Sequence, residues 1–179
     1  MRPDSADLAV IAGQLGRRPR GVHRVVARCP QGFPAVVEDL PYDERGRPFP
    51  TLFYCTCPTL VAAVARLESA GGVTAWRRRL EADPALLASL RAATAATRRR
   101  RRALMRFVAA EPVDGGASLA LGVGGVREPR GIKCLHAHVA HALARPGYRF
   151  GEEVLAALER PWCEDRRCAV FLAAGEADP

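Results

Sequence analysis

Several features are missing from this 179-residue chain, and each absence narrows what the protein can be. The longest uninterrupted apolar stretch, residues 60–65, is far too short to cross a bilayer, so we expect no membrane association. The first residues include no apolar segment of the kind that directs secretion. With 49% apolar and 26% charged residues, the composition is that of a globular chain. We therefore expect a globular cytoplasmic protein.

Asparagine is absent, and lysine and isoleucine are scarce. The chain has one lysine, Lys133, and two isoleucines, against 26 arginines. This pattern is typical of a GC-rich genome, so much of the arginine excess reflects mutational bias rather than selection for a phosphate-binding surface. The formal net charge of +8 still permits an anionic partner. Lys133 is of interest because it departs from the bias.

Two common motifs are also missing. There is no Cys-x-x-Cys pair of the zinc-finger type, and no Gly-Lys-Ser or Gly-Lys-Thr follows the glycine-rich stretch 122–125, so this stretch is not a P-loop. The arginine run 98–102 would wrap every face of a helix, and aromatic stacking partners are few nearby. A solvated arm is therefore favoured over a nucleic-acid contact, which stays open as an alternative.

The pattern of apolar residues predicts one α+β domain over residues 1–179. Three short strands are close in sequence and should pair as a small antiparallel sheet, packed with five to six helices. The strands are expected at 21–28, 35–38 and 51–55, and the helices at 5–15, 58–70, 74–80, 83–109, 132–144 and 151–160. A glycine-rich loop covers 111–131, and a polar tail covers 161–179. Thr97 and Arg101 interrupt the apolar stripe of the long helix, so we expect that helix to leave the core there.

The chemistry of the chain is concentrated in its cysteines and histidines. Six cysteines in a reducing compartment more often bind metal or react than form disulfides. Residues 133–141 hold three of the four histidines. At about 100° per residue on a helix, Cys134, His138 and His141 share one face, whereas His136 lies opposite. One thiol and two imidazoles then project together, as in Cys/His zinc sites.

One helix cannot close a metal site, so further ligands must come from elsewhere in the chain. Each of Cys29 and Cys57 precedes a proline, as cysteines at iron–sulfur clusters often do. Cys57 at a helix start and Cys134 in a first helical turn are positions that favour the thiolate. The predicted metal ligands are Cys29, Cys57, Cys134, His138, His141 and Cys168, with Cys163 as the alternative to Cys168. An all-thiolate set suits an iron–sulfur cluster and a mixed set suits zinc, while buried structural thiols or a reactive cysteine remain open.

Basic residues also flank the predicted helix start near residue 132. Arg127, Arg130 and Lys133 are close to a helix N-terminus, which attracts a phosphate or a carboxylate. The first hypothesis is therefore a metal-binding protein with an adjacent anion site. A second is an enzyme or sensor for a phosphorylated small molecule or polyphosphate, with Cys134 or Cys57 and a histidine as its reactive groups. A third is a nucleic-acid or protein adaptor that uses the arginine run.

Four segments carry a resemblance to a known family. Residues 15–21, 28–34, 49–58 and 133–144 resemble the bacterial family called domain of unknown function 501, and the similarity extends from about Leu8 to Arg160. The resemblance implies a cytoplasmic housekeeping role, because members are often encoded beside an exopolyphosphatase-type phosphatase and a septum-formation protein. It supports as motif positions Cys29, Cys57, Cys134, His136, His138 and His141. It argues against Cys55 as a ligand, because that position is usually apolar in relatives.

Overall fold

A three-stranded antiparallel sheet forms the centre of the protein. The computed structural model describes residues 2–128 and 130–174. The strands β1 (Val22–Arg28), β2 (Pro34–Asp39) and β3 (Phe53–Cys55) lie in the order β1-β2-β3. Seven α-helices accompany them in the described residues, one or two more than expected. The predicted α+β class and its N-terminal antiparallel sheet are confirmed.

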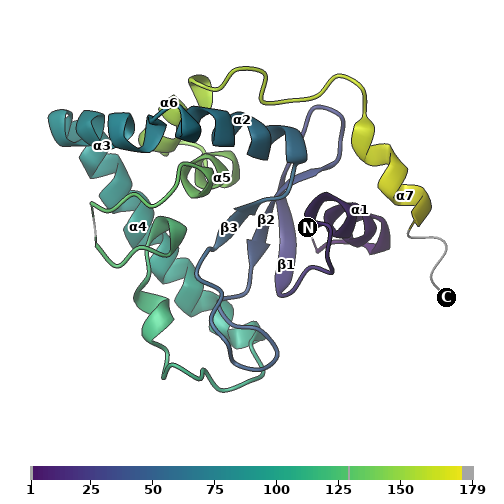
Figure 1. Ribbon diagram of the computed structural model, residues 1–179. Coiled ribbons are helices and arrows are strands. Elements are labelled where there is room, and N and C mark those ends of the chain that lie inside the picture. The colour runs from purple at the N-terminus through teal and green to yellow at the C-terminus, as the bar shows by residue number, and fades with distance from the viewer. Residues whose placement is uncertain (1, 129, 175–179) are drawn as a thin grey trace.

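The sheet is covered on both faces, which explains why every residue of β2 is buried. On one face, helix α1 (Ser5–Leu15) places Ile11 against Val25 and Val37. On the other, Val36 joins the main core with residues of the remaining helices. Figure 1 shows α1 on one side of the strands and α4 and α5 on the other. α1 begins and ends where the sequence predicts, at an Asp4 cap and at the left-handed Gly16.

The other helices follow the sheet in sequence. They are α2 (Pro58–Ser69), α3 (Gly72–Ala82), α4 (Pro84–Leu104), α5 (His136–Ala144), α6 (Arg149–Ala156) and α7 (Val170–Ala174). The Asp83 carboxylate caps α4 by accepting hydrogen bonds from the amides of Ala85 and Leu86. None of the helices in the described part of the chain is both long enough and apolar enough to span a membrane.

The prediction that the long helix leaves the core at Thr97 and Arg101 is wrong. Both residues are buried, and the Arg101 guanidinium donates to the carbonyl groups of Phe49, Pro50 and Ser118. The neighbouring Arg100 pairs with the buried Glu38 carboxylate at 2.7 Å. The arginine run is therefore not simply a solvated arm, because two of its members lock α4 onto the sheet and the loops.

The loop at 111–131 is packed rather than freely exposed. It contains two short 3₁₀ turns, Ala117–Ala120 and Val123–Gly125. Gly125 has a positive φ, and a Cβ atom there would lie 2.8 Å from Pro50 Cβ. The glycine thus allows this loop to contact the segment that leads into β3.

The tail after residue 161 also folds onto the protein. A 3₁₀ turn at Arg167–Ala169 leads into α7, and the side chain of Phe171 packs on Gly13 of α1, where a Cβ atom would clash with the ring. Figure 1 shows α7 beside α1. This packing buries Cys168, so a segment with a polar sequence delivers a cysteine to the core.

Candidate metal centre

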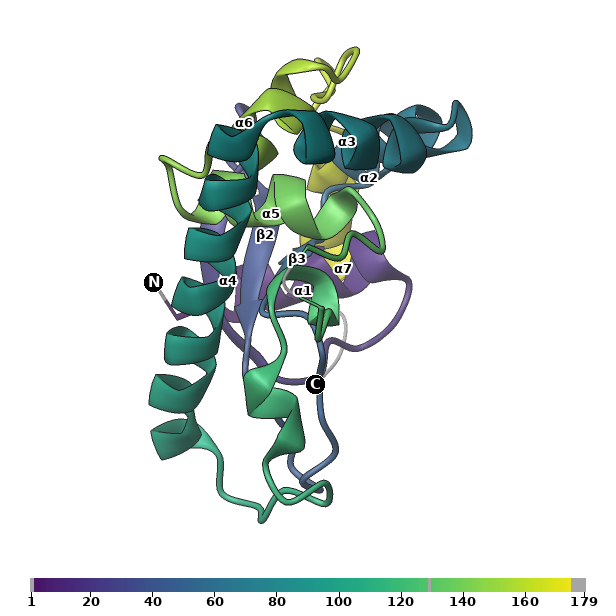
Figure 2. The same ribbon diagram turned by 90° about the vertical axis from the view of Figure 1, so that its left-hand side faces the viewer.

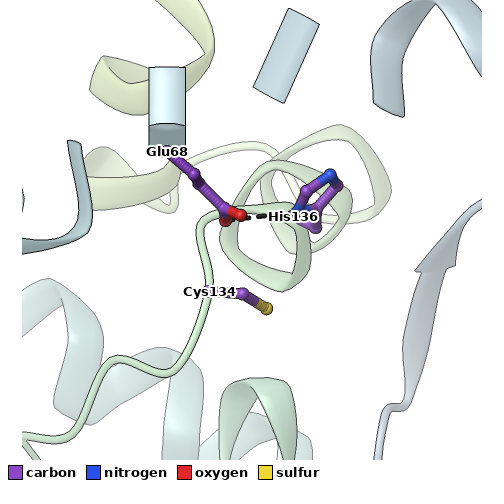
Figure 3. A group of neighbouring side chains, drawn as sticks. All are labelled: Glu68, Cys134 and His136. Carbon is purple, nitrogen blue, oxygen red and sulfur yellow. Dashed lines mark hydrogen bonds and ion pairs between the residues drawn. The ribbon is translucent and has the colours of Figure 1, made fainter. Parts of the chain in front are cut away.

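Glu68, Cys134 and His136 form the candidate site where the end of α2 meets the start of α5 (Figure 3). Glu68 is in the last turn of α2, His136 is the first residue of α5, and Cys134 lies just before that helix. One ligand atom from each residue lies within 4.8 Å of the other two. The side chains of Glu68 and His136 are 22% and 27% exposed, so a solvated ion could reach them.

The Glu68 carboxylate joins the two helices. Its Oε1 accepts a hydrogen bond from the Leu135 amide and lies 3.2 Å from Nδ1 of His136. A carboxylate at this position also satisfies the positive end of α5. The helix N-terminus that the sequence marks as an anion site therefore already holds an anion, supplied by the protein itself.

The imidazole of His136 is held from its other side. Nε2 lies 3.2 Å from the carbonyl oxygen of Val61. A carbonyl oxygen only accepts hydrogen bonds, so Nε2 carries a hydrogen in this contact. In a neutral ring Nδ1 then has only a lone pair, and this lone pair faces the negatively charged Glu68 oxygen. The Nδ1 lone pair and the Glu68 oxygen repel each other unless a positive charge lies between them, either a proton or a metal ion.

Cys134 completes the group with a sulfur atom. Burial raises the pKa of this thiol, and the Glu68 carboxylate raises it further. The amides of Ala137 and His136 and the ammonium group of Lys133 lower it, but the pKa is raised overall. Cys57 behaves in the same way at the start of α2. Burial raises the pKa of its thiol more than the amides of Leu60 and Thr59 lower it, and the thiol forms no capping hydrogen bond. The prediction that both positions favour the thiolate in the free protein is therefore wrong.

An apolar pocket of about 270 Å³ adjoins the site. Cys134, His136 and Ala137 line one part of it, and the rest is lined by the residues of β3, by Thr51 before that strand and by Val61 of α2. Cys55, one of those β3 residues, donates its thiol hydrogen to the carbonyl oxygen of His136 at 3.6 Å. Two of the three candidate ligands therefore border a space large enough for a small molecule.

The family of proteins of unknown function DUF501 matches residues 25–156. The chain belongs to this family. The match includes Glu68, Cys134 and His136, together with Cys29 and Cys57, whereas Cys168 lies outside it. No curated protein and no solved structure matches the chain.

In this DUF501 protein, the predicted face that combines Cys134 with His138 and His141 does not form. The predicted helix over 132–144 begins only at His136, so Cys134 precedes it and helical spacing does not apply to it. The structure brings Cys134 together with His136 instead, which the helical wheel placed on the opposite side.

His138 and His141 lie in an aromatic part of the core. The Tyr148 hydroxyl lies 2.7 Å from Nδ1 of His138, and the Thr97 hydroxyl lies 3.4 Å from Nδ1 of His141. Burial lowers the pKa of His138 to about 3 and that of His141 to about 4, so both rings are neutral near pH 7. Nε2 of His138 has no hydrogen-bond partner in the described part of the chain. Their assignment as metal ligands stays a prediction.

Three other predicted ligands, Cys29, Cys57 and Cys168, are buried in the main core and are here called the thiol group. The sulfur atoms of Cys29 and Cys168 lie close enough to Cys57 to raise its pKa, after the larger effect of burial. Gln14 Nε2 donates both to Cys168 Sγ at 3.5 Å and to the carbonyl oxygen of Pro34 at 2.8 Å. Cys163 is half-buried outside this group.

The three predicted anion-binding residues differ in their contacts. Lys133 donates from Nζ to the carbonyl oxygen of Gly125 at 3.3 Å, while Arg127 and Arg130 are exposed. Because Glu68 occupies the start of α5, an external anion at Lys133, Arg130 and Arg127 stays a prediction.

Glu68 is the site residue that sequence reasoning missed. The amphipathic pattern of 58–69 makes it one polar residue among several on a helix surface. One signal was available: a carboxylate in the last turn of a helix faces the negative end of the dipole, so it needs a compensating partner. Here the partners are the Leu135 amide and His136.

Proposed function

We propose that this protein binds one divalent transition-metal ion, of which zinc fits best, through Glu68, Cys134 and His136. The observation that supports this most strongly is the orientation of His136. The Val61 carbonyl holds Nε2–H, so Nδ1, beside the Glu68 carboxylate, is the ring atom that a metal ion can use in place of a proton. A backbone carbonyl that fixes the second ring nitrogen is the usual support of a metal-binding histidine.

The donor atoms suit zinc in type and spacing. One carboxylate oxygen, one sulfur and one imidazole nitrogen are all zinc ligands, and the thiolate argues against magnesium and calcium. Ligand atoms at about 2.0–2.1 Å from a tetrahedral zinc ion are about 3.3 Å apart. The separation between Glu68 Oε1 and His136 Nδ1, 3.2 Å, is consistent with that geometry.

The charges of the site are also compatible with a divalent ion. A carboxylate and a thiolate together supply two negative charges, which one divalent ion neutralises. Metal coordination would displace the thiol proton of Cys134, and the charge of the ion would offset the burial and the Glu68 carboxylate, which raise the pKa of this thiol in the free protein. Three protein ligands leave one position for a water molecule or a substrate atom, the arrangement typical of catalytic zinc. The adjoining apolar pocket gives such a ligand a place to bind.

Zinc titration of the metal-free protein against a chromophoric chelator tests this proposal. We expect one zinc ion per chain, and an affinity at least about tenfold lower in Cys134→Ser, His136→Gln and Glu68→Gln. Glu68→Gln keeps an oxygen for the Leu135 amide, so it removes the charge while retaining the helix contact. Cys163→Ser is the matched control and should bind as the wild type does. A chain that takes up no stoichiometric zinc, or variants that bind zinc unchanged, would contradict the assignment.

The thiol group is a second candidate centre. Its three buried cysteines come from the end of β1, the start of α2 and the C-terminal segment. Sulfur ligands of one tetrahedral zinc ion are about 3.8 Å apart. In the described residues, these sulfurs do not belong to a set within 4.8 Å of one another. An iron–sulfur cluster takes four thiolate ligands, so a cluster at these three thiols would need one further ligand.

Iron and sulfide analysis of anaerobically purified protein, with its visible absorption spectrum, tests the second centre. We expect a coloured protein that loses iron and colour in Cys57→Ser but keeps both in Cys163→Ser. A colourless, iron-free protein would exclude the cluster without affecting the zinc proposal, because the two sites share no residue.

A further inference from the structure

Arginines gather in a hollow that the metal proposal does not use. The hollow has a volume of about 570 Å³ and lies between the segment that joins α1 to β1 and the loop that joins β2 to β3. Arg17, Arg18 and Arg20 line it from the first segment, and Arg47 lines it from the second. We call this space the arginine hollow. Its four guanidinium groups face only one lining carboxylate, that of Asp43.

Asp43 is already engaged within its own loop. Its carboxylate accepts from Arg47 Nε at 2.8 Å and from the backbone amides of Arg45 and Arg47 at 2.9 Å. This pairing fixes Arg47 against the wall of the hollow. Among the ion pairs of the described residues, none involves Arg17, Arg18 or Arg20.

Two arginines of the neighbouring sheet, in contrast, each form an ion pair with a carboxylate. Arg24 pairs with Glu38, and Arg28 pairs with Asp7. The three unpaired arginines of the hollow therefore concentrate positive charge in a concave space, which attracts anions more strongly than a flat surface does.

A second hollow, of about 620 Å³, adjoins the first and shares five lining residues with it: Arg18, Arg20, Gly21, Leu40 and Asp43. Its further lining is apolar or aromatic apart from Glu44, and it includes Phe107. Phe107 is 39% exposed, although it is a large apolar side chain. In Figures 1 and 2 the loop after β2 and the segment after α4 lie together, at the end of the molecule opposite α2.

We infer that the two hollows together bind an organic phosphate that carries a flat apolar group, the class to which nucleoside phosphates belong. The phosphate lies among Arg17, Arg18 and Arg20, because guanidinium groups bind phosphate oxygens through paired hydrogen bonds. The flat group lies against Phe107, where it covers exposed aromatic surface. The volume of each hollow is in the range of ligand sites in proteins. This site is independent of the metal centre and shares no residue with it.

Calorimetric titration of the full chain with ADP tests the inference. We expect ADP to bind more tightly than inorganic phosphate, adenosine to bind weakly or not at all, and the ADP affinity to fall as salt is added. The double variant Arg18→Gln/Arg20→Gln should bind ADP at least about tenfold more weakly.

The control is Arg78→Gln/Arg91→Gln, which removes the same charge from two exposed helical arginines outside the hollows. It should bind ADP as the wild type does, and circular dichroism should show that both variants are folded. An equal loss in the control would show that net charge alone causes the effect, which would overturn the inference. A lack of ADP binding would also overturn it. Binding of a single-stranded oligonucleotide but not of ADP would also overturn it, in favour of a nucleic-acid surface.

Discussion

Arg101 is buried although it belongs to a run of five arginines, residues 98–102. It is completely buried, and burial lowers its pKa, an effect that the nearby Tyr42 and Asp114 oppose. Its guanidinium group donates to three backbone carbonyls from two loops. These carbonyls have few alternative donors in the interior, so the side chain acts as the hydrogen-bonding centre for the loops around α4.

Replacement of Arg101 by alanine should therefore be costly. The change leaves buried carbonyl groups without donors and opens a cavity, so we expect a loss of about 3 kcal/mol in the free energy of unfolding. Arg102→Ala removes an exposed arginine from the same run and should change stability by less than about 0.5 kcal/mol. Urea denaturation of both variants measures the difference, and equal losses would contradict the role assigned to Arg101.

At the scale of elements, α5 is the helix on which most of the chemistry depends. Its first residue belongs to the candidate metal centre, and its next turn carries two neutral imidazoles into the core. The helix contacts β3 and α6, so it is fixed on two sides. Neutral histidines in this position make the packing of α5 sensitive to acid.

The sign of this effect follows from the pKa values. Those of His138 and His141 are about 3 and about 4 in the folded protein, below the ordinary value of 6.5. Below pH 6.5 the unfolded chain therefore binds more protons at these two residues, and their contribution to stability is lost as the pH falls. For each residue the loss between pH 7 and pH 5 is about 2 kcal/mol. Asp39 acts in the opposite direction, because burial raises its pKa to about 8.

The variant His138→Gln should remove one of the two acid-sensitive groups while Asp39 is unchanged. Between pH 7 and pH 5 the wild type loses about 2 kcal/mol of stability at His138, and the variant does not. Relative to its own stability at pH 7, the variant should therefore be about 2 kcal/mol more stable at pH 5 than the wild type is. His23→Gln is the control, because this ring is only partly buried and a smaller shift is expected. An unchanged pH dependence in His138→Gln would show that the ring is not held neutral.

At the scale of the whole molecule, local patterns predicted most of the fold. The strands β1 and β2, the helix α1 and the start of α2 lie within a few residues of their predicted positions, because they depend on alternation, capping residues and proline. The errors occur where distant contacts decide the outcome. The arginine run looked solvated because Glu38 and the carbonyl groups that hold it lie far away in sequence.

The candidate site was predictable only in part. The cluster 133–141 includes Cys134, which is also a member of the candidate group, but the choice among its histidines depended on where the helix begins. Glu68 sets that start by accepting from the Leu135 amide across 67 positions of sequence. A pattern read along one segment cannot contain such a contact, so the third member of the group becomes visible only in the folded chain.

Under the proposed function, the double use of the Glu68 carboxylate would link ion uptake to the docking of two helices. One oxygen serves both the Leu135 amide and the His136 ring, so an ion drawn to that oxygen competes with the bond that holds the start of α5 against α2. This coupling is reciprocal. If the bound ion weakens the contact between α5 and α2 by some factor, then breaking that contact changes the affinity for the ion by the same factor. A measurement of how firmly the two helices dock would then also report on binding of the proposed ion.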